Sequence, residues 1–215
     1  MYTNSFRADF GDTLGVRRLT AISYTSLSNS GSVVALRQLK PNDAPIPGTD
    51  IALPIEGNVK DVEAGILAGP TGTLESSFVM VTYYRVDTFS SETPGFYARF
   101  YLWDIVNSSC IPYSYGSTLF PYVLEPNVAQ YGRISLDIHH AKEAMIVYEK
   151  SGQIKFRRAI SSGTDPFAGS TVFTATEVDN ARLPDVSYSG SGVFFSYLDL
   201  DDNRIHTDSW AGFGT

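Results

Sequence analysis

The sequence predicts an all-β fold: a small β-propeller of about four four-stranded blades, with a β-sandwich or jelly roll as the alternative. Three observations lead to this prediction. Aromatic residues make up 13% of the chain and charged residues only 18%, which favours strands over exposed helices. Short β-branched and aromatic runs alternate with turn sequences such as Ser151-Gly152, as many short antiparallel strands require. Finally, one strand pattern recurs along the chain.

Each copy of this pattern opens with an aspartate followed by an apolar residue. The opening aspartates are Asp9, Asp61, Asp137 and Asp185, at intervals of 52, 76 and 48 residues. The first and last intervals match the length of a propeller blade, about 40–50 residues. The long interval holds two insertions, at 87–95 and 106–116. We therefore expect a single domain, 1–215, with repeat units at about 1–50, 51–117, 118–170 and 171–215.

The strands of each unit follow in order. Second strands carry Tyr24, Tyr83, Tyr148 and Tyr197; we expect these tyrosines to be buried, with each hydroxyl bonded to backbone or to a repeat aspartate. Third strands are expected at 33–39, 98–105, 154–160 and 204–210, and fourth strands at 51–55, 119–124 and 172–178. For the last unit we expect segment 2–6 to pair with 204–210, because such a pairing would close the ring.

The segment RLPDV at 182–186, leading to VFFSY at 193–197, resembles β-propellers of the sialidase/BNR kind. The resemblance covers nearly the whole chain and implies a propeller fold. The Asp-box motif of that family, S-x-D-x-G-x-x-W, is absent, and neither its arginine triad nor its Tyr/Glu nucleophile pair is matched. The resemblance therefore implies a fold rather than sialidase activity.

The repeat aspartates are candidate metal ligands. If Asp9, Asp61, Asp137 and Asp185 open the innermost strands, they could ring one mouth of a central channel. Clustered carboxylates repel one another unless they are protonated or bridged, and Ca²⁺ would relieve that repulsion. Alternatively, each aspartate accepts backbone N–H bonds and fixes the connection between units. No other cofactor is expected.

Four aromatic residues are candidate ligand-binding residues: Tyr97, Trp103, Tyr113 and Tyr115. Exposed aromatic rings stack on sugars or anchor protein partners. The two tyrosines of the second insertion are the stronger candidates, because an insertion in one repeat maps to a loop on one face. For Trp103 the alternative is packing between blades.

No catalytic residue is predicted, because the chain lacks the GxSxG, HExxH and GxxxxGK[ST] motifs. His139 and His140 are adjacent and point to opposite faces of a strand, so they do not chelate one ion easily. We interpret Cys110 as an unpaired structural thiol, the acidic segment 199–203 as a solvated hairpin turn, and His206 as an isolated strand residue.

The net charge of −7 argues against nucleic-acid binding. No apolar run approaches the roughly 18 residues of a membrane span, and the first residues do not form a signal peptide. We expect an extracellular or particle-surface location.

The leading hypothesis is a non-catalytic recognition module for a glycan or protein partner. The alternatives are a structural component of a virion, tail or surface appendage, and a glycoside-active enzyme on a propeller scaffold. The sequence leaves the oligomeric state open.

Overall fold

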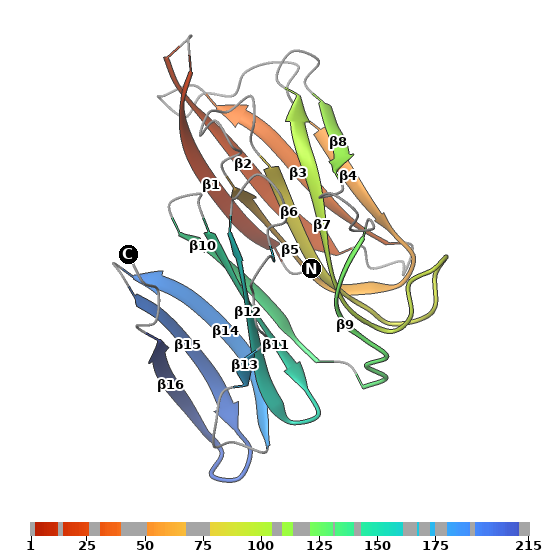
Figure 1. The fold of residues 1–215 in the computed structure, drawn as a ribbon, viewed down its shortest axis with the longest axis vertical. Coiled ribbons are helices and arrows are strands. Elements are labelled where there is room, and N and C mark those ends of the chain that lie inside the picture. Colours follow the sequence, from red (N-terminus) through yellow and green to blue (C-terminus); the bar gives the residue numbers. More distant parts are fainter. Residues whose placement is uncertain are drawn as a thin grey trace.

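The computed structural model describes residues 3–12, 15–25, 31–39, 51–67, 78–104, 109–113, 121–130, 132–139, 143–160, 167, 173–174, 180–189 and 192–210. These residues form sixteen β-strands in four antiparallel sheets (Figure 1). The prediction of an all-β fold is therefore confirmed. None of the described residues lies in a helix with the length and apolar character that crossing a membrane requires.

Each sheet is built largely from consecutive strands, so neighbours in sequence are neighbours in space. The first sheet contains β1 (Thr3–Asp12), β2 (Gly15–Thr25), β3 (Gly31–Leu39) and β4 (Ile51–Glu56). The second contains β5 (Val59–Leu67), β6 (Phe78–Arg85), β7 (Gly95–Asp104), β8 (Ser109–Tyr113) and β9 (Tyr122–Pro126). The third contains β10 (Ile134–His139), β11 (Glu143–Lys150), β12 (Gln153–Ile160) and β13 (Phe173–Thr174). The fourth contains β14 (Ala181–Ser189), β15 (Gly192–Asp199) and β16 (Arg204–Trp210).

The predicted order of strands is found in the first three sheets, with an additional strand, β8, in the second; three strands are described in the fourth. The expected third strands correspond to β3, β7, β12 and β16, and the expected fourth strands to β4, β9 and β13. The turn between β11 and β12 shows why the sequence folds this way locally. Ser151 and Gly152 both have positive φ, 51° and 78°, and a two-residue hairpin turn of this twist favours glycine.

A β-bulge recurs in the first strands of the second and fourth sheets. In β5 the pairing with β6 shifts at Asp61, which has a φ of 47°, and in β14 the pairing with β15 shifts at Leu183, with a φ of 52°. The two bulges lie opposite Tyr83 and Tyr197. The bulge falls at Asp61 in one sheet but two residues before Asp185 in the other, so these repeat aspartates do not occupy equivalent backbone positions.

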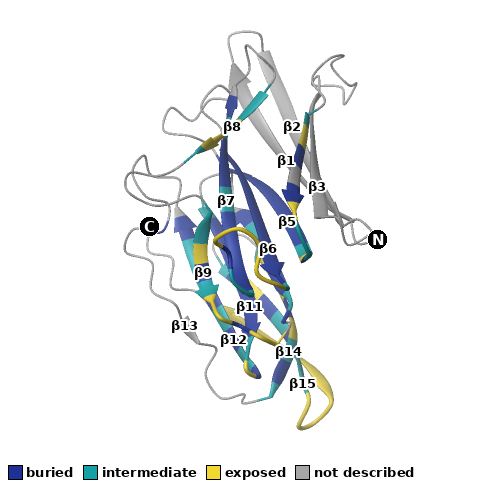
Figure 2. Ribbon diagram, turned by 90° about the vertical axis from the view of Figure 1, so that its right-hand side faces the viewer, coloured by how far each residue is buried: buried dark blue, intermediate teal, exposed yellow. Residues whose placement is uncertain are grey.

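The sheets pack face to face and meet along their first strands. Strand β5 lies beside β1 on one side and β10 on the other, and β10 lies beside β14. Three hydrophobic clusters fill the spaces between the first and second, second and third, and third and fourth sheets. Figure 2 shows the buried residues concentrated in β6, β7 and β11.

The repeat tyrosines are buried as predicted wherever their side chains are described: Tyr83 and Tyr148 are 0% exposed and Tyr197 is 8% exposed. The side chain of Tyr24 lies outside the described set. The expected partner was wrong for Tyr83, because its hydroxyl bonds to the carboxylate of Glu92 rather than to a repeat aspartate.

The predicted closure is also wrong. Strand β1 pairs with β2 along its whole length, from Thr3 opposite Tyr24 to Asp12 opposite Gly15. It is therefore the first strand of the first sheet and not the missing fourth strand of the last. A local hairpin loses less loop-closure entropy than a pairing with the far end of the chain, so β2 is the better partner.

Candidate functional site

Two short strands share the outer edge of β7. Strand β8 pairs with the second half of β7, and β9 pairs with the first half. As a result Tyr113 lies opposite Phe100 and Tyr122 lies opposite Ala98, two positions that share one face of the sheet. We call β8 and β9 together the ledge.

The ledge exposes apolar side chains to solvent. Ile111 is 50% exposed and Val123 is 45% exposed, and Pro112 is also exposed. Ile111 lies opposite Leu102, whereas Val123 lies opposite Tyr97. These two side chains are therefore on opposite faces of the sheet, and Ile111 is the one that shares a face with Tyr113 and Tyr122.

The two ledge tyrosines are half-buried and held by aromatic neighbours. The ring of Tyr113 packs against Phe78 with centroids 4.9 Å apart. The ring of Tyr122 packs against Phe167 at 4.4 Å, and the guanidinium of Arg157 lies 5.5 Å from the Tyr122 ring centroid. Their orientations are therefore fixed, which reduces the entropy that a partner would have to remove on binding.

The other predicted ligand-binding aromatics lie elsewhere. Tyr97 is 2% exposed and Trp103 is 0% exposed, both in the cluster between the first and second sheets. The Tyr97 hydroxyl donates to the carbonyl of Thr93 at 2.7 Å, and its ring stacks on Tyr83 with centroids 5.7 Å apart. Neither ring presents a face to solvent, and Tyr115 lies outside the described residues.

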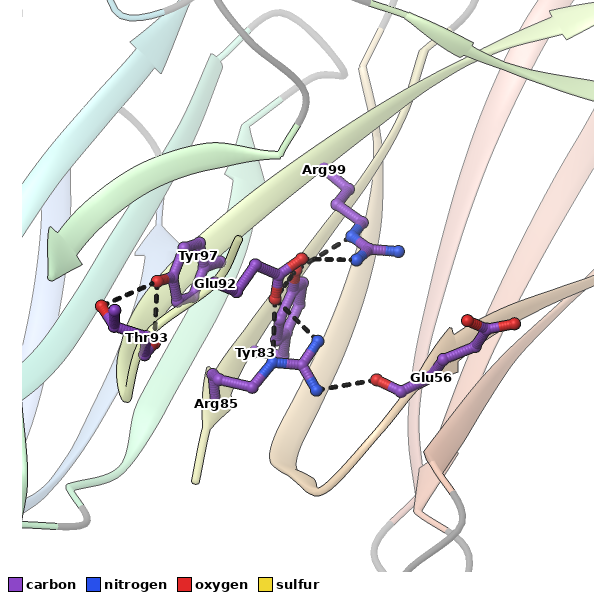
Figure 3. A network of polar contacts seen from close by, with 7 residues as sticks. All are labelled: Glu56, Tyr83, Arg85, Glu92, Thr93, Tyr97 and Arg99. Atoms are coloured by element: carbon purple, nitrogen blue, oxygen red, sulfur yellow. Dashed lines mark hydrogen bonds and ion pairs between the residues drawn. The ribbon is translucent and has the colours of Figure 1, made fainter. Parts of the chain in front are cut away.

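A buried polar network crosses the second sheet next to its first insertion (Figure 3). Glu92 accepts hydrogen bonds from both Nε and Nη2 of Arg85, at 2.9 and 2.7 Å, and from Arg99 Nη2 at 2.6 Å. Tyr83 donates its hydroxyl proton to the same carboxylate at 2.9 Å. Arg85 Nη1 donates to the carbonyl of Glu56 at 2.7 Å, so the network also ties β4 of the first sheet to the second.

Burial governs the ionisation of this network. Arg85 is 0% exposed and Glu92 is 4% exposed. Burial, followed by the neighbouring Glu92, raises the pKa of Tyr83 far above its ordinary value. Burial alone would lower the pKa of Arg99, but its contacts with Tyr83 and Glu92 outweigh that effect and raise it. Tyr83 therefore stays protonated and neutral, and the network clamps the 87–95 insertion onto the sheet.

A row of acidic side chains links the first strands of adjacent sheets. Glu63 on β5 accepts a hydrogen bond from the backbone N–H of Leu136 on β10. In the same way Asp137 on β10 accepts one from the N–H of Tyr188 on β14, at 2.7 Å. Each carboxylate thus satisfies a backbone donor of the next sheet, the role that we weighed for the repeat aspartates as an alternative to metal binding.

Glu63 is the described carboxyl group with the strongest shift toward its neutral form. Burial, with smaller contributions from the charges of Asp185 and Asp61, raises the pKa of Glu63 to about 8, even though the N–H of Leu136 and the charge of Arg133 oppose the rise. Its carboxyl group therefore holds a proton at neutral pH. Perturbed acids of this kind occur both in buried structural contacts and in catalytic sites.

The remaining repeat aspartates take different positions. Asp185 is exposed and accepts a hydrogen bond from the hydroxyl of Ser135 at 2.8 Å, across the boundary between the third and fourth sheets. Asp61 lies in the bulge of β5, and Asp9 lies in β1, where its side chain is outside the described set. Among the described residues, the repeat aspartates do not form a cluster of three ligands with metal-binding spacing.

The described residues that do have this spacing are Asp199, Asp202 and His206, whose ligand atoms lie within 4.8 Å of one another. His206 Nε2 lies 2.9 Å from Asp202 Oδ2 and 4.0 Å from Asp199 Oδ2. The pKa of Asp202 is lowered, chiefly by its hydrogen bond with His206. The imidazole ring of His206 stacks on Tyr197 with centroids 5.7 Å apart. The segment 199–203 is the hairpin turn that the sequence predicted. The interpretation of His206 as an isolated strand residue was wrong, because it contacts Asp202 and Tyr197.

Cys110 lies on the ledge as an unpaired, half-buried thiol. Burial raises the pKa of Cys110 to about 12. The thiolate, which is the nucleophilic form, is therefore disfavoured at neutral pH, in agreement with the interpretation of this residue as structural.

No protein-family model matches the chain, and no curated protein matches it. In structure the chain is similar to an exo-1,5-α-L-arabinanase from a bovine ruminal metagenomic library, with 11% identity and a TM-score of 0.45, over 90% of this chain and 70% of that one. It is also similar to a variant ACO/RPE65 chimera, with 12% identity and a TM-score of 0.36, over 95% of this chain and 49% of that one. At these values neither likeness bears on substrate or activity.

Sequence reasoning missed two functional arrangements. The network around Glu92 joins residues that are 7 to 9 positions apart, but Glu92 lies in a turn-rich insertion with no strand periodicity. The available signal was a run of alternating charge around a hairpin: Arg85, Glu92 and Arg99. The ledge was missed because the pairing of two strands with one edge of β7 is a tertiary feature.

Proposed function

We propose that this chain is a non-catalytic recognition module on a propeller-like scaffold, and that it binds a protein partner through the ledge. One observation carries the proposal. Ile111 is exposed on the same face of the ledge as Tyr113 and Tyr122, whose rings are already held in place. A pre-ordered aromatic pair beside an exposed aliphatic side chain is the arrangement that interface hot spots favour.

The scaffold part of the proposal treats the four sheets as propeller blades. In a propeller, consecutive blades meet along their innermost strands and pack face to face. The row from β1 through β5 and β10 to β14, with a hydrophobic cluster between each pair of sheets, supports this interpretation. Insertions in one blade then lie on one face, as ligand-binding loops do.

A protein partner is favoured over a glycan by the chemistry of the ledge. Sugar binding needs an open aromatic face together with convergent polar donors and acceptors. Here the exposed Ile111, which shares a face with Tyr113 and Tyr122, is aliphatic. Arg157 beside Tyr122 adds a residue type that is enriched at protein interfaces.

The test compares two matched surface substitutions. Ile111→Asp places a charge on the ledge, and Leu183→Asp places the same charge at a 54% exposed position of the fourth sheet, where aspartate tolerates the positive φ. Each purified protein is immobilised, exposed to the extracellular proteins of its source, and washed. Bound proteins are quantified by mass spectrometry, and affinities of identified partners are then measured with purified components.

We expect a partner that the wild type and Leu183→Asp retain equally and that Ile111→Asp binds at least about tenfold more weakly. Equal retention by all three proteins would contradict the proposal. A glycan array run in parallel distinguishes the other ligand class: glycan binding that Ile111→Asp abolishes would assign the ledge to carbohydrate.

A second candidate function, glycoside hydrolysis, is supported by Glu63. A buried carboxyl group that stays protonated at neutral pH is what a general acid requires, and the exposed carboxylate of Asp185 is close enough to affect its pKa. The test is hydrolysis of a panel of aryl-glycosides by the wild type and Glu63→Gln. Activity that is lost in Glu63→Gln would favour the enzyme, and no hydrolysis by the wild type would reject it.

A further inference from the structure

Among the described residues, the fourth sheet has one strand fewer than each of the other sheets. In the first three sheets the third strand, β3, β7 or β12, is flanked on its outer edge by at least one further strand, and every such pairing is antiparallel. In the fourth sheet the third strand is β16, and no described strand pairs with its outer edge. Figure 1 shows β16 at the outer end of the molecule.

The outer edge of β16 has no partner strand among the described residues, and the strand is regular. The strand pairs with β15 from Arg204 to Trp210 without a register shift, so no bulge turns the edge away. The side chains from Arg204 to Ser209 are exposed except that of His206, which is half-buried, and Ile205 is 76% exposed. A straight exposed edge presents unpaired N–H and C=O groups to another strand.

We propose that β16 pairs edge to edge with β16 of a second copy of this chain, so that two fourth sheets join into one continuous sheet. A strand added beside β16 would be antiparallel if it followed the pattern of the other sheets. Two identical strands related by a two-fold axis are necessarily antiparallel. The second copy therefore supplies a strand of the right direction without any change in the fold of either copy.

The charges on β16 fit this pairing. Residues 204, 206 and 208 lie on one face of the strand, because side chains alternate. When the two-fold axis passes through His206, Arg204 of each copy lies opposite Asp208 of the other, and the symmetry makes two such pairs. On the other face Ile205 lies opposite Thr207 of the second copy, a pairing of two β-branched residues that favours strand association.

The contact is small. A single edge of seven residues lies at the low end of interface sizes, so the dimer should form and dissociate with protein concentration. The ledge belongs to the second sheet and β16 to the fourth. Dimer formation and ledge binding can therefore succeed or fail independently.

Sedimentation velocity over a hundredfold concentration range tests the pairing. The wild type should shift from monomer to dimer as concentration rises. Asp208→Arg replaces both attractive pairs by Arg–Arg repulsion and should weaken dimerisation about tenfold. The double variant Arg204→Asp with Asp208→Arg exchanges the charges and should restore it. A wild type that remains monomeric, or a double variant as weak as Asp208→Arg, would overturn the proposal.

Disulfide trapping tests the register. Residues that face each other directly across antiparallel strands have Cα atoms about 4.5–5.5 Å apart, within the range that a disulfide spans. In a Cys110→Ser background, His206→Cys should therefore form an intermolecular disulfide under mild oxidation. Ser187→Cys, an exposed position on β14 at the far edge of the sheet, should not. Equal cross-linking of both variants would show random collision rather than the proposed pairing.

Discussion

Replacing Glu92 by glutamine should destabilise the protein strongly, because Glu92 is the only charged partner of the fully buried Arg85 among the described residues. Glutamine keeps the size of the side chain but removes its negative charge. Arg85 remains ionised, since guanidinium groups do not lose their proton in proteins. The variant therefore contains an uncompensated charge in the space between the first and second sheets.

The size of the effect follows from the geometry. Arg85 donates two hydrogen bonds to one carboxylate oxygen, and Arg99 donates one to the other oxygen. Removing one partner of a buried ion pair costs about 3–5 kcal/mol. For a chain of this length each kcal/mol corresponds to about 2–4 °C in Tm. We expect Glu92→Gln to lower Tm by roughly 6–20 °C.

The assay is thermal and urea unfolding followed by circular dichroism. Asp202→Asn serves as the control, because Asp202 and its partner His206 are 41% and 40% exposed and such a pair contributes about 0–1 kcal/mol. Adding Arg85→Met to Glu92→Gln should recover stability, since it removes the unpaired charge. If Glu92→Gln behaves like the control, or if the double variant is less stable than the single one, the buried charge is not what the carboxylate compensates.

Two further predictions concern the contacts between β5 and β10. The pKa of Glu63 is raised from 4.5 to about 8, so between these pH values the native state holds a proton that the unfolded state has released. The free energy of unfolding should therefore fall as pH rises across that window. Urea titrations should show a smaller fall in Glu63→Gln, and an identical pH dependence in both proteins would count against the raised pKa. A Cβ added at Gly65 would clash with Ile138 Cδ1, so Gly65→Ala should lower the free energy of unfolding by about 1–3 kcal/mol. Adding Ile138→Val removes that methyl group and should recover part of the lost stability in the same unfolding assay. If it recovers none, the clash lies elsewhere.

The repetitive part of the fold could be predicted from the sequence because it depends on local patterns. Strands with alternating apolar residues, hairpin turns such as Ser151-Gly152, and the buried tyrosines Tyr83, Tyr148 and Tyr197 are all encoded within a few residues of one another. The bulges opposite Tyr83 and Tyr197 could not be predicted from the sequence, because neither Asp61 nor Leu183 indicates a positive φ as strongly as glycine does.

The candidate site could be predicted only in part, because aromatic side chains serve packing and binding equally well. The sequence placed Tyr97 and Tyr113 in the same candidate group, and only the tertiary structure separates a ring stacked between sheets from one beside the exposed Ile111. The row of acidic side chains that includes Glu63 and Asp137 could not be predicted, for a related reason. The partners of Glu63 and Asp137 are backbone groups on another sheet, and a sequence does not specify which backbone groups lack partners.

Packing through successive sheets also determines how the molecule should come apart. Each cluster couples one sheet to the next, so the contacts that hold a sheet in place come from its nearest neighbours. The cluster between the third and fourth sheets contains the fewest described core residues. Amide hydrogens of β15 and β16 should therefore exchange with solvent through openings that leave β6, β7 and β11 protected. Pulling the chain from its ends should release the fourth sheet as a separate, low-force step.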